Sequence, residues 1–186
     1  MKIWSWYGAG NGYTALLPVR NEDIFSGVFA ADGTHKTWAT RPQVKPGIER
    51  VKKKQKPLGD LSPLMGASVV MNEKAHGALK AFLEPFGQFL ELDLVDETGL
   101  AGGDQPMYFY NVTNVIPCID FEKSETEDGH VIKPAFVPGA VPASAQVFKD
   151  PLLRKTNIFL NDAAHAELQG LVNKTNLLGS TFRIAS

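Results

Sequence analysis

The sequence of 186 residues contains one cysteine, Cys118, which excludes an intrachain disulfide and a cysteine-rich zinc site. It has no apolar run approaching the roughly 18–20 residues of a membrane-spanning helix. The first residues include an early lysine but no apolar segment typical of a secretory signal. We therefore expect a cytoplasmic protein that does not associate with a membrane, in which Cys118 packs as a small hydrophobic residue.

Recognisable catalytic motifs are also missing. The sequence has neither the Gly-x-Ser-x-Gly turn of serine hydrolases nor a phosphate-binding Gly-x4-Gly-Lys loop. The glycine-rich stretch at residues 8–12 lacks the spacing of a dinucleotide-binding loop and is better explained as a turn. These absences favour binding over catalysis, so we expect no enzyme activity, no cofactor and no metal site.

The net charge of −1 conceals two blocks of opposite sign. Residues 36–56 contain eight basic side chains and one acid, whereas residues 91–128 contain ten acids and one base. Such blocks steer charged partners and rarely dictate a fold. The candidate partner-binding residues come from the acidic block: Asp96, Glu97, Asp104, Asp120, Glu122, Glu125, Glu127 and Asp128.

One phrase occurs twice in the chain, as VVMNEKAHGALKAF at residues 69–82 and IFLNDAAHAELQGL at residues 158–171. In each copy an apolar run precedes an asparagine and an acid. This order predicts a buried strand and then a helix, because asparagine accepts a bond from the first helical turn and an acid favours the positive end of the helix dipole. We therefore expect Asn72 and Asn161 to be helix N-caps.

The repeated phrase also repeats a histidine, His76 in the first copy and His165 in the second. Each follows the first alanine of the apolar stripe, which places it at the edge of the buried helix face. A half-buried imidazole in contact with its neighbours is the plainer interpretation. A metal or acid–base pair would need further ligands in register, which neither helix offers. Convergence of the two histidines on one concave site would favour an enzyme.

Patterns elsewhere predict mainly strands and turns. An Asp-Gly pair between two apolar segments is typical of a hairpin turn, and stretches rich in Pro, Gly and Lys are typical of exposed connections. The predictions are a strand at residues 2–7, a hairpin centred on Asp32-Gly33, an exposed connection at 41–63, strands at 107–116 and 131–137, and an acidic turn or loop at 120–130.

Together these patterns predict an α+β fold: a mixed, mostly antiparallel sheet with two main helices, in which a strand–helix–strand unit occurs twice. Neither unit can bury its apolar face alone, so we expect the two to pack together. Residues 58–186 would form the domain that contains the repeat. Residues 1–57 would form an N-terminal region of strands and loops, within the same domain or as a separate lobe.

Over residues 58–186 the order of several weak signals resembles immunity family eleven of bacterial polymorphic-toxin systems. The matching signals are a strand ending in asparagine, an aspartate before an acidic turn with a serine, a segment containing phenylalanine, and a closing Leu-Gly-x-x-Phe. The corresponding residues are Asn111, Asp120, Ser124, Phe148, Leu178, Gly179 and Phe182. The resemblance implies a non-catalytic antitoxin that binds one cognate toxin domain and needs no cofactor.

The acidic block suits such a role, because toxins that cut nucleic acids have basic clefts that an acidic surface can occupy. A nuclease is therefore the candidate class of partner. Asn111, Asp120 and Ser124 are expected to shape loops by bonding to neighbouring backbone groups. Two alternatives remain: an enzyme, such as a hydrolase, that reverses a toxin's modification, and a nucleic-acid-binding module using residues 36–56. Residues 41–56 contain no aromatic side chain, which argues against single-strand binding.

Overall fold

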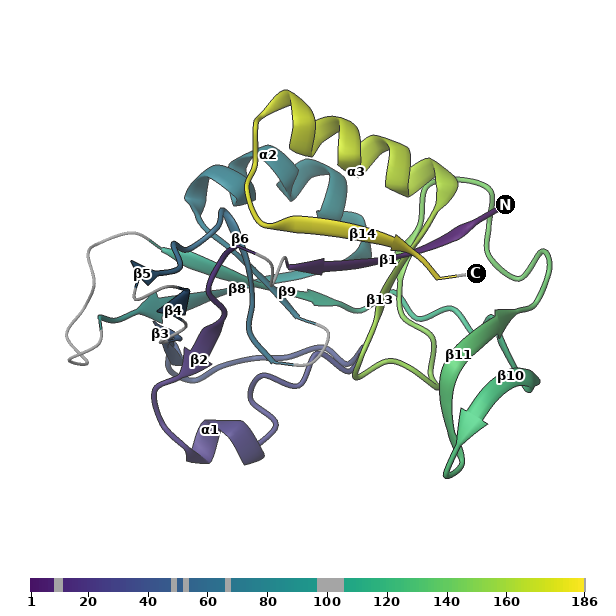
Figure 1. The fold of residues 1–186 in the computed structure, drawn as a ribbon, viewed down its shortest axis with the longest axis horizontal. Helices are drawn as coiled ribbons and strands as arrows, with labels where there is room; N and C mark the ends of the chain where they lie inside the picture. The colour runs from purple at the N-terminus through teal and green to yellow at the C-terminus, as the bar shows by residue number, and fades with distance from the viewer. Residues whose placement is uncertain (9–11, 48–49, 52–53, 66–67, 97–105, 186) are drawn as a thin grey trace.

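Figure 1 shows a computed structural model that describes residues 1–8, 12–47, 50–51, 54–65, 68–96 and 106–185. The helices are α1 (Glu22–Phe25), α2 (Glu73–Leu83), α3 (Asp162–Lys174) and the 3₁₀ turn η1 (Glu84–Phe86). The strands are β1 (Ile3–Gly8), β2 (Leu16–Pro18), β3 (Gln43–Pro46), β4 (Arg50–Val51), β5 (Lys54–Gln55), β6 (Leu61–Pro63), β7 (Val69–Met71), β8 (Gly87–Leu94), β9 (Met107–Val112), β10 (Ile119–Glu127), β11 (His130–Phe136), β12 (Val147–Phe148), β13 (Ile158–Asn161) and β14 (Ser180–Ile184).

The described strands form two larger sheets and two separate hairpins. One sheet has the order β12-β13-β1-β14 and the other β2-β3-β8-β9-β7-β6, while β10 pairs with β11 and β4 with β5. Every pairing of named strands is antiparallel except that of β3 with β8. The predicted α+β class, with its mostly antiparallel sheet and two main helices, is confirmed. No helix in the described ranges is long and apolar enough to span a membrane.

The repeated phrase forms two equivalent units, β7–α2–β8 and β13–α3–β14. Each unit holds a third strand between its two outer strands, antiparallel to both. In the first unit this central strand is β9, which follows β8 along the chain. In the second it is β1, which comes from the beginning of the chain. The two units therefore share one strand order but differ in connectivity, and β1 from the N-terminal region is part of the second unit.

The registers establish which residues of the two central strands correspond. Tyr110 of β9 faces Val69 in the first unit, and Trp6 of β1 faces Ile158 in the second. These equivalent rings meet where the units adjoin, with centroids 6.1 Å apart. Helices α2 and α3 contact one another and lie side by side in Figure 1. The two repeat units thus pack against one another and are related by an approximate two-fold axis.

The shared core consists mainly of equivalent apolar side chains from both units. Each helix buries three residues on one stripe, and full burial of each leucine or valine among them contributes about 1.5–3 kcal/mol. The buried stripe residues are Ala75, Leu79 and Leu83 of α2 and Ala164, Leu168 and Val172 of α3. The spacing of these residues is what the sequence pattern predicts for amphipathic helices packed on sheets.

Both repeated asparagines stand at helix N-caps. Asn72 and Asn161 have extended backbones, and each Oδ1 accepts a bond of 2.9 Å from the backbone N–H three residues later. The amide of Asn161 also donates to the carbonyls of Pro142 and Ser144. Each cap therefore joins its helix to another segment as well as satisfying a backbone donor.

The hairpin predicted around Asp32-Gly33 is wrong, because no strand forms between residues 26 and 38. The Asp32 carboxylate instead accepts from the backbone and hydroxyl of Thr34, which closes a local turn. The side chain of Gln88 pairs with the backbone of Lys36, accepting at 2.7 Å and donating at 2.8 Å. Side-chain bonds thus replace the strand ladder that the apolar pattern suggested.

The prediction of an exposed connection at residues 41–63 is also partly wrong. Strand β3 lies inside the six-stranded sheet, and Val44 within it is fully buried. Arg41 from the basic block pairs with Glu91 and Asp93 from the acidic block. Apolar burial and charge pairing with β8 therefore outweigh the flanking prolines.

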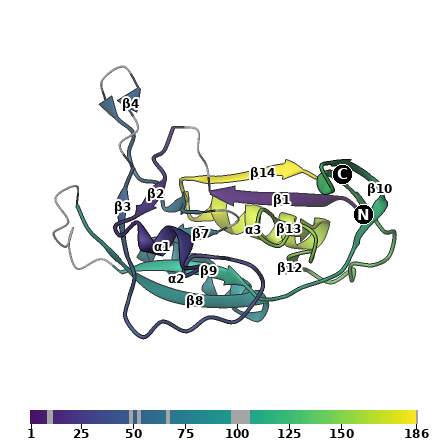
Figure 2. The ribbon, with the colours of Figure 1, turned by 90° about the horizontal axis from the view of Figure 1, so that it is seen from below.

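The acidic turn or loop predicted at residues 120–130 is a strand over most of its length. Strand β10 extends to Glu127, and only Asp128-Gly129 forms the turn. Cross-strand pairing explains the difference, because Glu125 faces Lys133 on β11 and their side chains form an ion pair of 2.6 Å. Figure 2 shows this hairpin at one end of the molecule and β3 and β4 at the other.

Candidate interaction surface

The β10–β11 hairpin stands apart from both larger sheets, at the lower right of Figure 1. Its two turn residues have left-handed backbones, with φ of 50° at Asp128 and 77° at Gly129. Positive φ at both central residues defines the tight turn that matches the twist of a hairpin. The turn therefore fixes the pairing of the strands and presents their acidic side chains on a defined frame.

Ser124 holds the irregular part of this hairpin. The register shifts between Asp120 and Glu125, where β10 bulges. The Ser124 hydroxyl donates to the Asp120 carbonyl at 2.6 Å and accepts from the Ala135 N–H at 2.9 Å. Two of the residues that carry the family resemblance thus shape the bulge that β10 needs to stay paired with β11.

The hairpin acids fall into two groups. Asp120 pairs with Lys123 at 2.7 Å, and the Lys123 bond lowers the pKa of this carboxyl; Glu125 pairs with Lys133. Three others are exposed and form no ion pair within the described ranges: Glu122, Glu127 and Asp128. Glu127 and Asp128 lie at the turn, and Glu122 lies further back along β10, in the bulged stretch between Asp120 and Glu125. These three residues, called the acidic tip below, are the part of the predicted contact set with unneutralised charge.

The remaining acids of the predicted set do not join the hairpin. Asp96 follows β8, whose final residues pair with β3 at the opposite end of the molecule in Figures 1 and 2. Glu97 and Asp104 lie outside the described residues. Of the eight predicted contact residues, the structure therefore brings together those between 120 and 128.

A groove of about 500 Å³ lies between the hairpin and a turn at residues 151–156. Its apolar side chains include Phe121 and Leu152, which are 46% and 49% exposed. Its polar side chains include Arg154 and Lys155 on the turn. Large apolar groups exposed beside charged ones are typical of a surface that binds another molecule.

Two adjacent buried residues at the end of β12 position both walls of the groove. The Lys149 ammonium donates to the carbonyls of Arg154 at 2.9 Å and Asn157 at 3.3 Å, which holds the turn. The Asp150 carboxylate accepts from the backbone N–H of Cys118, Ile119 and Leu152 at 2.7–2.9 Å, which ties the base of β10 to the same turn. The groove is therefore supported from beneath by two buried side chains, Lys149 and Asp150.

Burial perturbs the titration of groups in this region. Burial lowers the pKa of Lys149 to about 7, although the charge of Asp32 opposes the change. Burial, together with Asp150, raises the pKa of Cys118 to about 12. The thiol is 1% exposed and packs in an apolar cluster with Phe148 and Phe159, so it lacks the accessible thiolate of a nucleophile.

The repeated histidines pack on aromatic rings. His76 stacks on Tyr108 with a centroid separation of 3.7 Å, and His165 stacks on Trp4 at the same separation. Each also meets the edge of a phenylalanine, Phe89 for His76 and Phe182 for His165. Burial lowers the pKa of both imidazoles. The two aromatic sets share no residue, and no group of three or more metal-ligating side chains occurs among the described residues.

The other positions that carry the resemblance have structural contacts. Asn111 is buried and donates from its amide to the carbonyl of Thr34 at 2.7 Å. Phe148 is fully buried, whereas Phe182 packs on His165.

The closing Leu178-Gly179 pair lies against β6. Gly179 has a φ of 93°, and a Cβ there would lie 2.1 Å from the Leu61 carbonyl oxygen. Leu178 is half exposed, but its backbone bonds to β6 through Leu61.

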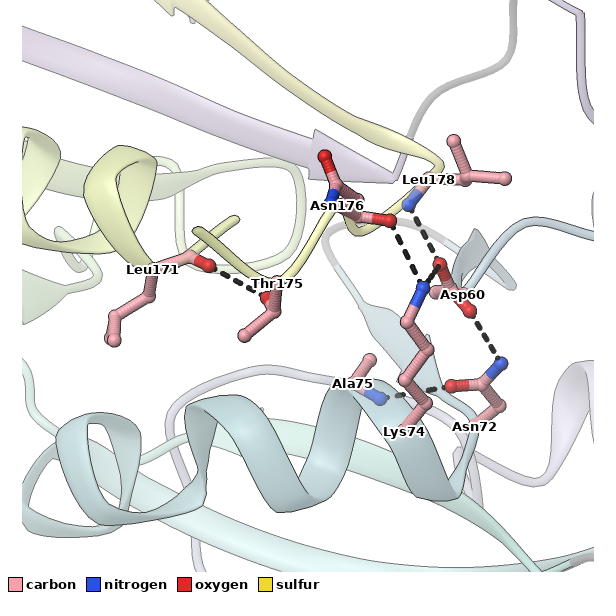
Figure 3. Close-up of polar contacts among 8 residues, drawn as sticks. All are labelled: Asp60, Asn72, Lys74, Ala75, Leu171, Thr175, Asn176 and Leu178. Carbon is pink, nitrogen blue, oxygen red and sulfur yellow. Dashed lines mark hydrogen bonds and ion pairs between the residues drawn. The ribbon is translucent and has the colours of Figure 1, made fainter. Parts of the chain in front are cut away.

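Asp60, which no sequence pattern singled out, forms a polar junction between the two units (Figure 3). Its carboxylate accepts from the Asn72 amide at 2.8 Å, the Lys74 ammonium at 3.1 Å and the Leu178 N–H at 2.8 Å. Partial burial alone would raise the pKa of Asp60, but these bonds outweigh it and hold the pKa below its ordinary value. Asp60 lies within the Pro/Gly/Lys-rich stretch at residues 41–63, for which the sequence predicted exposure.

The Lys149-Asp150 pair was also missed, although the sequence carries a weak signal. The segment QVFKDP places two charges directly after an apolar strand and before a proline. Buried polar side chains are nearly always hydrogen-bonded, most often to backbone groups or water. In the basic block at residues 36–56, Lys52 and Lys53 lie outside the described residues.

The chain matches no family model, and no curated protein matches it. The geometry of the hairpin and groove is therefore the basis for a functional proposal.

Proposed function

We propose that this protein is an immunity protein that binds a cognate bacterial toxin domain and neutralises it by direct occlusion. The observation that supports this most is the separate hairpin whose tip acids, Glu122, Glu127 and Asp128, are exposed without ion pairs in the described structure. The resemblance over residues 58–186 points to the same role. Binding of this kind requires neither a cofactor nor a catalytic residue.

The chemistry of the acidic tip favours a toxin with a basic cleft, such as a nuclease. Charges of one sign on a defined frame accelerate encounter with a surface of opposite sign and disfavour wrong partners. A stable interface involves about 20–30 residues on each side. The hairpin and the neighbouring turn at 151–156 together are of that size, so we expect both to contact the toxin.

A survival assay tests the proposal. The toxin domain encoded by the neighbouring gene is expressed in a naive bacterium with and without this protein, and the two proteins are then co-purified. We expect rescue and a one-to-one complex with the wild type. The triple variant Glu122→Lys, Glu127→Lys and Asp128→Lys is expected to lose rescue and to weaken binding at least about 100-fold, since each contact charge is reversed.

A matched control reverses three exposed acids away from the hairpin, Glu22, Glu84 and Glu167, and changes the net charge equally. It should rescue as well as the wild type. Rescue without a complex would contradict occlusion and support an enzyme that reverses the toxin's modification. Absence of both rescue and binding with the wild type would reject the immunity function.

A further inference from the structure

We infer that the groove beside the hairpin binds a segment of the toxin that carries an apolar side chain next to a carboxylate. This inference rests on the proposed function and deepens it. The toxin would then make two contacts of opposite charge. Its basic surface would face the acidic tip, and a carboxylate-bearing segment would enter the groove.

The shape of the groove fits an inserted side chain. Its volume of about 500 Å³ is within the range of pockets that hold peptide side chains or small ligands. Phe121 and Val131 contribute apolar surface from the hairpin, and Leu152 contributes it from the opposite turn. An apolar side chain placed between them would cover two large hydrophobic groups that are now about half exposed.

The charge of the groove specifies what accompanies that side chain. His130, Arg154 and Lys155 line it, and among its described lining residues none is acidic. Arg154 and Lys155 are exposed and form no ion pair within the described part of the chain. A guanidinium and an ammonium that line one groove favour a carboxylate, with which arginine can form two parallel hydrogen bonds.

The groove is also held in shape before any partner arrives. Lys149 bonds to the carbonyls of Arg154 and Asn157, and Asp150 bonds to the backbone of Cys118 and Ile119 at the base of the hairpin. Lys149 is 0% exposed and Asp150 is 1% exposed, so these bonds are shielded from water. A preformed groove loses less conformational entropy on binding than a mobile one.

A peptide titration of the full-length protein tests the inference. The probes are two tetrapeptides blocked at both ends, Asp-Leu-Phe-Glu and Lys-Leu-Phe-Lys, and the readout is the set of backbone amide shifts in ¹⁵N spectra. We expect the acidic peptide to shift Gly129, Val131, Leu152 and Thr156, and to bind at least about ten-fold more tightly than the basic peptide. The double variant Arg154→Glu and Lys155→Glu should reverse that preference.

The control variant Lys80→Glu and Lys174→Glu changes the same number of exposed charges elsewhere and should keep the preference for the acidic peptide. The inference is overturned if neither peptide shifts the groove amides at millimolar concentration, or if the basic peptide binds equally well. The peptide result does not depend on any toxin.

Co-purification with the toxin separates the two proposals. We expect the Arg154→Glu, Lys155→Glu variant to bind the toxin at least about ten-fold more weakly than the wild type. Unchanged binding by this variant, with binding lost in the acidic-tip variant, would reject the groove as a contact and retain the immunity function.

Discussion

Trp6 and Tyr110 occupy equivalent positions on the central strands of the two repeat units, and their rings meet at a centroid separation of 6.1 Å. Each ring also has its own polar contact. The Trp6 indole donates to the Ser180 hydroxyl at 3.0 Å, and the Tyr110 hydroxyl donates to the Leu83 carbonyl at 2.9 Å. Contact between equivalent residues is the property expected of two copies related by an approximate two-fold axis.

This contact predicts energetic coupling between the units. Trp6→Leu and Tyr110→Leu should each lower the free energy of unfolding by about 2–5 kcal/mol, because each removes a fully buried ring. The double variant should be less destabilised than the sum by about 0.5–1.5 kcal/mol, the usual value of an aromatic pair. Urea unfolding of all four proteins gives the coupling. Phe148 belongs to another core cluster, so the destabilisations caused by Phe148→Leu and Tyr110→Leu should add in the double variant.

Asp60 is predicted to stabilise the junction between the units in a pH-dependent way. Asp60→Asn should lower the free energy of unfolding at pH 7 by about 1–3 kcal/mol, since it weakens charge-assisted bonds to Lys74 and the Leu178 N–H. The folded pKa of Asp60 lies below the ordinary 3.8, so this stabilisation is complete above about pH 4 and is lost as the pH falls through the folded pKa. Denaturant titrations between pH 2.5 and 7 at about half-unit steps check this.

The exposed Glu73 provides the matched control for Asp60, because it lies in the first turn of α2, between the Asn72 and Lys74 side chains that bond to Asp60. Glu73→Gln should change the free energy of unfolding by no more than about 0.5–1 kcal/mol. An Asp60→Asn variant as stable as Glu73→Gln at pH 7 would show that the junction contributes little.

Two glycines are predicted to respond to alanine in opposite directions. At Gly77 in α2 an added Cβ meets nothing within 4 Å, and the equivalent position in α3 already carries an alanine, Ala166. Gly77→Ala should therefore stabilise the protein by about 0.5–1 kcal/mol. At Gly179 the positive φ and the clash with the Leu61 carbonyl should make Gly179→Ala destabilising by more than about 2 kcal/mol. Thermal unfolding of both variants is the measurement, and destabilisation by Gly77→Ala would contradict the helix packing.

Lys149 is predicted to make the stability rise with pH in the alkaline range. Its pKa is about 7 in the folded protein and 10.5 for an ordinary lysine, so the unfolded chain binds more protons between these values. The free energy of unfolding should therefore increase from about pH 7 toward pH 10, and Lys149→Met should remove much of that increase. Urea midpoints across this range are compared with those of Lys174→Met, which changes an exposed lysine and should keep the wild-type slope. An equal slope in Lys149→Met would contradict the assignment.

The sequence by itself determined the local elements whose signals are short in range. Asn72 and Asn161 fix where two helices begin, because an asparagine oxygen reaches a backbone donor only three residues away. The apolar stripes of α2 and α3 follow from a spacing that repeats once per turn. The strands around Tyr110 and Ile158 follow from runs of residues that suit a pleated sheet.

The tertiary structure alone decided how these pieces are paired. Nothing in the local pattern near Trp6 indicates that β1 inserts between β13 and β14, because strand pairing depends on partners far along the chain. The burial of Asp60 had no local signal and that of Lys149 only a weak one, since a charged side chain is expected at the surface until other backbone groups are brought to bond it. The groove likewise depends on tertiary structure. Its two walls, the hairpin and the turn at 151–156, come together only because Asp150, just after β12, bonds to the base of the hairpin.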